Sequence, residues 1–198
     1  MVKKTNILAI LFVFIYALSH AAAAETTRTE EIHNHHIVKL AGTGSMYKKP
    51  LEDFDEEAMC FDIDLIDMKN GNIVGTATDC LSDVQPFGDG VKLIGTTFFK
   101  LPEGILITRG KVSVQPALEE TKSESGLPFT HITGASSEGN TIIAGTGVFE
   151  GSTGNVRLSG MVDMSEFAMN EGDLLTFNCL FEIHLDQNAS RFSGNKQN

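Results

Sequence analysis

Two aspartates within one apolar segment are the first candidates for chemistry. Asp62 and Asp64 lie two residues apart in residues 59–68, where apolar and polar residues alternate. On a strand, such positions point the same way. If they point inward, the two carboxylates share an apolar cavity, and desolvation and mutual repulsion raise one pKa to give a proton donor. The alternative is that Phe61 and Ile63 form the core and both aspartates face water.

Two further pairs of polar residues could line a pocket. Glu182 and His184 share one face of the strand predicted over residues 174–185, and a histidine beside acids could act as a base or bind a ligand. Arg109 and Lys111 share a face of another predicted strand. Glu182, His184 and Arg109 are therefore candidate ligand-binding residues. The alternative for each pair is an ordinary pair on the protein surface.

The other signatures of metal or hydrolase sites are weak or absent. His33, His35 and His36 cluster near the N-terminus, but no cysteine or acidic ligand stands at a fixed spacing from them. The cluster could bind a metal, and the alternative is a solvated leader; we predict no metal site. No Gly-x-Ser-x-Gly or His-Glu-x-x-His motif indicates a hydrolase.

Short β-strands joined by turns are the elements that must position these residues. Apolar runs with the alternation of strands occupy eight segments, and Gly, Asn, Pro and Ser mark the links between them. The segments are 59–68, 73–84, 91–101, 105–114, 130–135, 141–145, 155–164 and 174–185. Such a meander predicts an all-β fold. It is either an eight-stranded antiparallel barrel, whose closure removes exposed edges, or a two-sheet sandwich.

The cysteines depend on the register of the first predicted hairpin. If a pair closes in an oxidising compartment, one of Cys60, Cys80 and Cys179 is left over. A three-residue link at Asn70-Gly71 sets Cys60 opposite Cys80, whereas a two-residue link sets Leu81 opposite Cys60. Cys60–Cys80 is the candidate disulfide, and the alternative is three buried thiols.

Residues 142–162 contain the densest motif of the chain. Gly145-Thr146-Gly147 is like the start of a dinucleotide-binding motif, but Glu150 stands at the position of the third glycine and no helix pattern follows. No Gly-Lys-Ser/Thr occurs, which excludes a phosphate-binding loop. The glycines are therefore predicted to serve tight turns and close approach between strands.

The same segment resembles the Gly-x-Gly-(Ile/Val)-Phe-Glu-Gly-x-x-Gly-x-Val-(Lys/Arg)-Leu stretch of allene oxide cyclases, and dirigent proteins share a looser form. The matching residues are Gly145, Gly147, Val148, Phe149, Glu150, Gly151, Gly154, Val156, Arg157 and Leu158. A weaker similarity spans residues 59–185. The resemblance implies the barrel rather than the sandwich, with Gly145, Gly147, Phe149, Gly151 and Gly154 shaping a turn. It also implies a homotrimer, with a homodimer as the alternative.

The resemblance further implies a largely apolar pocket that steers a reactive intermediate to one stereochemical outcome, with no metal or organic cofactor. Phe61-Asp62-Ile63 is similar to the Tyr-Glu-Ile of the cyclases, and Asp64 could match the aspartate of dirigent proteins. Asp62 and Asp64 are therefore the candidate catalytic residues. Two departures count against the same reaction on the same substrate: residues 91–101 lack the cyclases' cysteine, and Asn70-Gly71 replaces their Ser-Pro.

The N-terminus predicts export. Lys3 and Lys4, an apolar run over residues 7–18 and a final group of alanines make residues 1–24 a predicted signal peptide, and the run is shorter than the ~20 residues of a membrane span. The predicted location is secreted or periplasmic. Residues 25–58 are predicted to be a polar flexible leader before a barrel domain over 59–186, and residues 187–198 a polar tail.

The net charge of the chain disfavours some classes of binding partner. The chain has 26 acidic and 15 basic residues and a net charge of −11. Nucleic acids and stable membrane association through basic residues are therefore disfavoured. The partner that the resemblance implies is a small hydrophobic molecule.

Two function classes remain. One is a cofactor-free isomerase or cyclase that folds a hydrophobic intermediate, and the other is a non-catalytic barrel that binds a hydrophobic ligand or serves as an interaction module. Convergent acids with shifted pKa values inside the barrel would favour catalysis, whereas a uniformly apolar or filled interior would favour binding or a structural role.

Overall fold

The computed structural model describes residues 35–123, 126, 128–135 and 140–186, all within a compact unit that begins at Ile32. The predicted signal peptide, His33 and the polar tail lie outside the described residues. The elements are β1 (His35–Ser45), β2 (Tyr47–Leu51), η1 (Glu52–Phe54), β3 (Glu56–Asp67), β4 (Ile73–Phe87), β5 (Gly90–Leu101), β6 (Gly104–Lys122), β7 (Pro128–Ala135), β8 (Thr141–Gly145), η2 (Gly147–Phe149), β9 (Gly154–Asp163) and β10 (Leu174–Leu185). Here η1 and η2 are single 3₁₀ turns.

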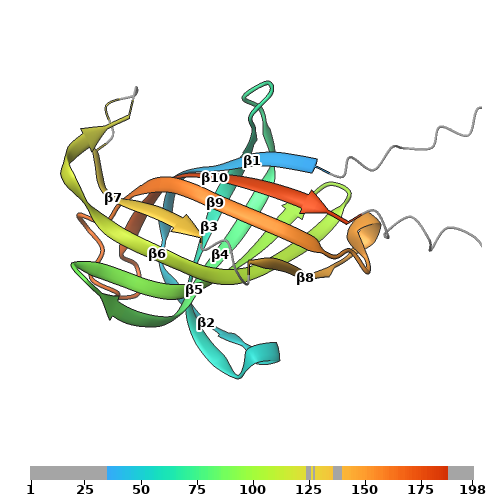
Figure 1. Cartoon of the computed structure of the whole chain (residues 1–198), viewed down its shortest axis with the longest axis horizontal. Helices are drawn as coiled ribbons and strands as arrows, with labels where there is room; N and C mark the ends of the chain where they lie inside the picture. The colour runs from blue at the N-terminus through green and yellow to red at the C-terminus, as the bar shows by residue number, and fades with distance from the viewer. Residues whose placement is uncertain (1–34, 124–125, 127, 136–139, 187–198) are drawn as a thin grey trace, which may run out of the picture. The chain divides into compact units, whose positions relative to one another are not determined.

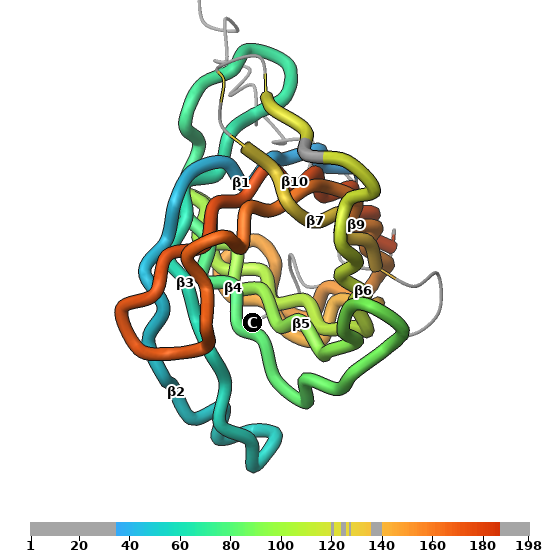
Figure 2. Tube along the Cα trace, turned by 90° about the vertical axis from the view of Figure 1, so that its left-hand side faces the viewer, coloured from blue at the N-terminus to red at the C-terminus, as the bar shows by residue number. Residues whose placement is uncertain are grey.

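The strands close into an antiparallel barrel (Figures 1 and 2). The order around the ring is β1, β10, β9, β7, β6, β5, β4, β3, and pairing between β1 and β3 closes it. β8 takes the same place as β7, between β6 and β9, further along those strands. β2 continues beyond β1 on the same edge of β3. The predicted all-β, eight-stranded antiparallel barrel is confirmed.

The barrel begins earlier than the sequence analysis predicts. Residues 35–51, assigned to a flexible leader, form β1 and β2, and β1 pairs with β10 along its whole length. The last strand therefore neighbours β1 and not β3. The pattern was hard to recognise because only Val38 and Leu40 of β1 are buried core residues, and the strand then continues through Gly42 and Gly44, which have no side chains to alternate.

The predicted disulfide is confirmed. Cys60 and Cys80 are direct partners on β3 and β4 with their Cα atoms 4.0 Å apart, and their sulfurs are bonded. The link between the strands is longer than three residues, since the last pair before it is Ile66 with Ile73. A bulge between the Leu65–Gly75 and Ile66–Ile73 pairs shifts the register, so that Cys60 and Cys80 lie opposite each other.

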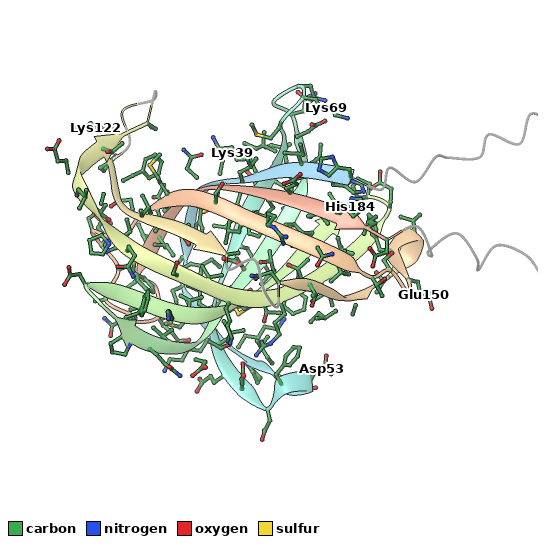
Figure 3. The ribbon with its side chains drawn as sticks, viewed as in Figure 1. Lys39, Asp53, Lys69, Lys122, Glu150 and His184 are labelled. Atoms are coloured by element: carbon green, nitrogen blue, oxygen red, sulfur yellow. A yellow bond between two sulfur atoms is a disulfide. The ribbon has the colours of Figure 1, made fainter. Side chains whose placement is uncertain are left out.

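The disulfide lies on the outer side of the barrel wall, because Phe61, next to Cys60, belongs to the inner core. It forms a small outer cluster with other residues of β2, η1, β3 and β5, namely Tyr47, Leu51, Phe54, Ala58 and Phe98. Figure 3 shows Asp53, on η1, projecting outside the barrel. β2 and η1 thus form a flap that pairs with β3 and packs over the disulfide, which itself links β3 to β4.

One end of the barrel is filled with side chains. The Phe99 and Phe181 rings meet edge to face with centroids 5.2 Å apart, and Leu106 and Ile183 are fully buried beside the same core. Phe149 of η2 is also buried in this core. The glycine-rich turn predicted from the sequence therefore serves to insert an aromatic side chain into the barrel end.

Candidate functional site

An apolar cavity occupies the barrel interior on the side away from Phe149. Its volume is about 70 Å³, and its walls come from β1, β3 to β7, β9 and β10. Leu93, Val112, Val114, Val162 and Phe177 are among the buried residues that line it. Since this half of the core is hollow and the other half is filled, the barrel has one closed end and one end with space for a ligand.

The link between β9 and β10 borders the cavity. Met164, Phe167 and Met169 of this link are lining residues, and Met169 is 47% exposed. Phe167 also contacts Phe61, with ring centroids 5.8 Å apart. The carboxylate of Asp173 accepts hydrogen bonds from the backbone N–H groups of this link, which hold it in shape and lower the Asp173 pKa. The cavity mouth is thus bordered by flexible thioether side chains on an ordered link.

Asp79 brings a carboxyl group into this apolar cavity. It lies on β4 directly opposite Phe61 and is only 9% exposed. The hydroxyl of Thr97, its partner on β5, donates a hydrogen bond of 2.7 Å to Asp79 Oδ1. Burial raises the pKa of Asp79 to about 6, and the hydrogen bond from Thr97 opposes this shift. Asp79 is the acid that could meet a ligand in the cavity.

The sequence analysis missed Asp79, although the register that predicted the disulfide contains the signal. Once Cys60 opposes Cys80 and Phe61 points inward, the residue opposite Phe61 must also point inward, and that residue is Asp79. The segment hides this position because polar residues occupy both faces of β4: Thr78 and Cys80 point outward on either side of Asp79.

Other polar residues also line this cavity, among them Thr108, Thr133, Asn140 and Cys179. Thr108 on β6 is the strand partner of Thr97 and is buried. Cys179 on β10 is a free, buried cysteine. Burial and the negative charge of Asp79 raise the Cys179 pKa to about 12, so the thiol stays protonated at neutral pH and is a poor nucleophile.

The structure places Asp62 and Asp64 on the outer face of β3, where both are exposed. Asp62, with 58% of its side chain exposed, accepts hydrogen bonds from Thr78 and Tyr47 and forms an ion pair with Lys100 at 3.6 Å. Partial burial raises the Asp62 pKa, but the hydrogen bond from Thr78 and the charge of Lys100 outweigh it and leave the pKa lowered. The structure therefore contradicts the possibility that both carboxyl groups point inward and form a shared proton-donor site.

Two of the candidate ligand-binding residues, Glu182 and His184, also lie outside the cavity. Glu182 is 54% exposed and pairs with His35 of β1 at 3.0 Å. His184 is exposed at the same end of β10, and Figure 3 shows it near the barrel end that carries Glu150. The structure brings Glu182 and His184 together with His35 on the surface, but not with Asp62 or Asp64.

Arg109 belongs to the cavity wall, but its guanidinium lies on the outer side of β6 and joins the wall to the flap. Its guanidinium donates hydrogen bonds to Glu56 at 2.9 Å and to Thr96 at 2.7 Å, and it stacks 4.0 Å from the centre of the Phe54 ring. Glu56 also accepts a hydrogen bond from Ser82, and the Arg109 and Ser82 contacts lower the Glu56 pKa. Lys111 is exposed on the same strand.

Neither a cluster of metal ligands nor a membrane-spanning helix is found in the part of the chain that the structure describes. No three His, Cys, Asp or Glu side chains gather there in a way that could hold a metal ion. No helix there combines the length and apolar character needed to cross a bilayer.

Comparisons with protein-family models, curated proteins and solved structures found no match for this chain, so the resemblance to allene oxide cyclases and dirigent proteins stays a prediction.

Proposed function

We propose that this protein is a binding barrel for a small, predominantly apolar molecule that enters the interior cavity and turns its polar group toward Asp79. The observation that supports this function is a single buried carboxyl among the described residues of a predominantly apolar cavity. Apolar pockets with a few placed polar groups are the usual form of small-molecule sites. Asp79 would orient the ligand, and the surrounding valines, leucines and phenylalanines would supply the affinity.

A pair of tryptophan variants on one strand tests this function. Val112 lines the cavity, whereas its neighbour Lys111 is exposed on the outer face of β6. Butanol should shift the methyl NMR signals of the cavity in the parent protein and in Lys111→Trp. It should not shift them in Val112→Trp, where the indole fills the space. Circular dichroism of both variants checks that the barrel is retained, and equal butanol binding by the two variants would contradict an interior site.

Acid catalysis is a second candidate function, favoured by the raised pKa of Asp79. With a pKa of about 6, part of the carboxyl population is protonated near neutral pH and could donate a proton to an oxygen of a bound molecule. Binding is the stronger proposal because the described cavity wall presents one carboxyl group, and the predicted pair of carboxyl groups, Asp62 and Asp64, faces outward.

The catalytic candidate predicts turnover that depends on Asp79. The parent should accelerate ring opening of a small unsaturated epoxide such as butadiene monoxide. Asp79→Asn should lose about 10²–10⁴-fold of that rate while still binding butanol, because a proton donor contributes about this much. A parent that binds butanol but leaves the rate of epoxide opening unchanged would leave the binding function alone.

A further inference from the structure

We infer that the cavity selects a short-chain primary amine, whose ammonium group pairs with the Asp79 carboxylate while its alkyl chain contacts the apolar wall. This inference rests on the proposed binding function and adds the chemical class of the ligand.

The first argument is the hydrogen bonding of Asp79. Oδ1 accepts the hydrogen bond from Thr97, and no described residue donates a hydrogen bond to Oδ2. The carboxyl group lines the cavity and is more than nine-tenths buried. Oδ2 is therefore open to the cavity, and a ligand that covers it without donating a hydrogen bond would leave a buried acceptor unmet, which costs free energy.

The second argument is charge. The ion pairs among the described residues involve Glu182, Asp62 and Glu56, all on the outer face, so none of them compensates Asp79. Desolvation is the main influence on its pKa, and no positively charged side chain counteracts it. A buried carboxylate with no counter-charge favours a cationic ligand. The net charge of −11 for the whole chain also attracts cations in preference to anions.

The third argument is the match between the site and an ammonium group. An ammonium has three N–H donors. Besides Asp79, the buried hydroxyl oxygens of Thr97 and Thr108 can accept hydrogen bonds, and these two residues are neighbours across β5 and β6. An alcohol could donate only one hydrogen bond here, and it would leave the carboxylate charge uncompensated.

The volume of the cavity limits the length of the ligand's alkyl chain. A cavity of about 70 Å³ holds roughly five to seven water-sized groups. Butylamine has a linear chain of that size, and butanol and butyrate have nearly the same shape with a neutral or negative polar group. These three compounds therefore separate the effect of charge from the effect of apolar contact.

The experiment measures binding of butylamine, butanol and butyrate to the full chain at neutral pH. Butylamine should bind about 10-fold or more tightly than butanol, as expected for a hydrogen bond between charged groups, and butyrate should bind least. In Asp79→Asn, butylamine affinity should fall to that of butanol. Asp64→Asn removes the same charge from an exposed position on β3 and should leave all three affinities unchanged.

The outcomes separate the inference from the function on which it rests. Equal binding of butylamine and butanol by the parent would overturn the amine assignment and leave the apolar binding function standing. Failure of all three compounds to bind would overturn both. A loss of butylamine affinity in Asp64→Asn equal to that in Asp79→Asn would assign the preference to general surface charge and would also overturn the inference.

A second measurement covers the case in which Asp79→Asn does not fold. In the parent, butylamine affinity should weaken as the pH falls through about 6, where Asp79 becomes protonated, while butanol affinity stays constant. The other titratable described groups that line the cavity are the Cys179 thiol, which remains neutral over this range, and Arg109, whose guanidinium is paired with Glu56 on the outer side of the wall. Butylamine affinity that does not change with pH would overturn the inference.

Discussion

Asp79 is expected to lower the free energy of unfolding by about 3 kcal/mol as the pH rises from 3.8 to about 6, and Asp79→Asn should abolish this decrease. Folding raises the Asp79 pKa from 3.8 to about 6 because the charged form is desolvated. The folded state therefore holds a proton that the unfolded state has released. The neutral carboxyl stabilises the fold fully below pH 3.8, and this contribution disappears as the pH passes about 6.

The measurement is urea unfolding of the parent and of Asp79→Asn across this pH range. The difference between the two proteins isolates Asp79 from carboxylates such as Glu56, Asp62 and Asp173, whose lowered pKa values change stability in the opposite direction. The free energy of unfolding of the variant minus that of the parent should be about 3 kcal/mol larger above pH 6 than at low pH. A difference that stays constant with pH would show that Asp79 is solvated.

Gly147→Ala is expected to destabilise the protein by about 2–5 kcal/mol. Gly147 has φ +62°, a conformation that costs a residue with a side chain about 1–2 kcal/mol. A Cβ atom at this position would also lie 2.2 Å from the carbonyl oxygen of Glu103. Relief of that overlap requires the backbone contact between the β5–β6 turn and η2 to open, at a further cost of about 1–3 kcal/mol.

Gly151→Ala is the matched control, because Gly151 lies in the same turn with φ +72° but has no atom within 4 Å of a new Cβ. It should cost only the conformational term of about 1–2 kcal/mol. Urea unfolding followed by circular dichroism gives both values. If the two variants lose equal stability, the contact of Gly147 with Glu103 does not constrain the turn.

The strands with a regular alternation could be predicted from the sequence. Phe61, Ile63 and Leu65 alternate with polar residues in β3 and all three belong to the inner core, as the pattern indicated. The first strand could not be recognised in the same way, since β1 is held by pairing with β10 along its whole length, and β10 is distant in the sequence. Two buried side chains, Val38 and Leu40, are too few to establish a period of two.

For the candidate site, alternation predicts where the exposed aspartates point but does not reveal Asp79. Alternation in β3 already favoured an outward orientation for Asp62 and Asp64, and the structure shows it. Asp79 violates the hydrophobic pattern because it places a polar side chain at an inward position. Such violations are expected at functional sites, where local preference is sacrificed, and periodicity alone cannot distinguish them from an exposed residue.

The pairing of the first described strand with the last determines when the barrel can be completed during synthesis. The hairpins from β3 to β6 join consecutive segments and can form as the chain leaves the ribosome. β1, in contrast, must wait for β10, and contacts at such a large sequence separation form slowly. Until β10 has been synthesised, the edge of β1 that pairs with it has no strand partner. If two chains exchanged β1 while this edge is open, the product would be a domain-swapped dimer, so the late pairing of β1 marks strand exchange as a route of misassembly.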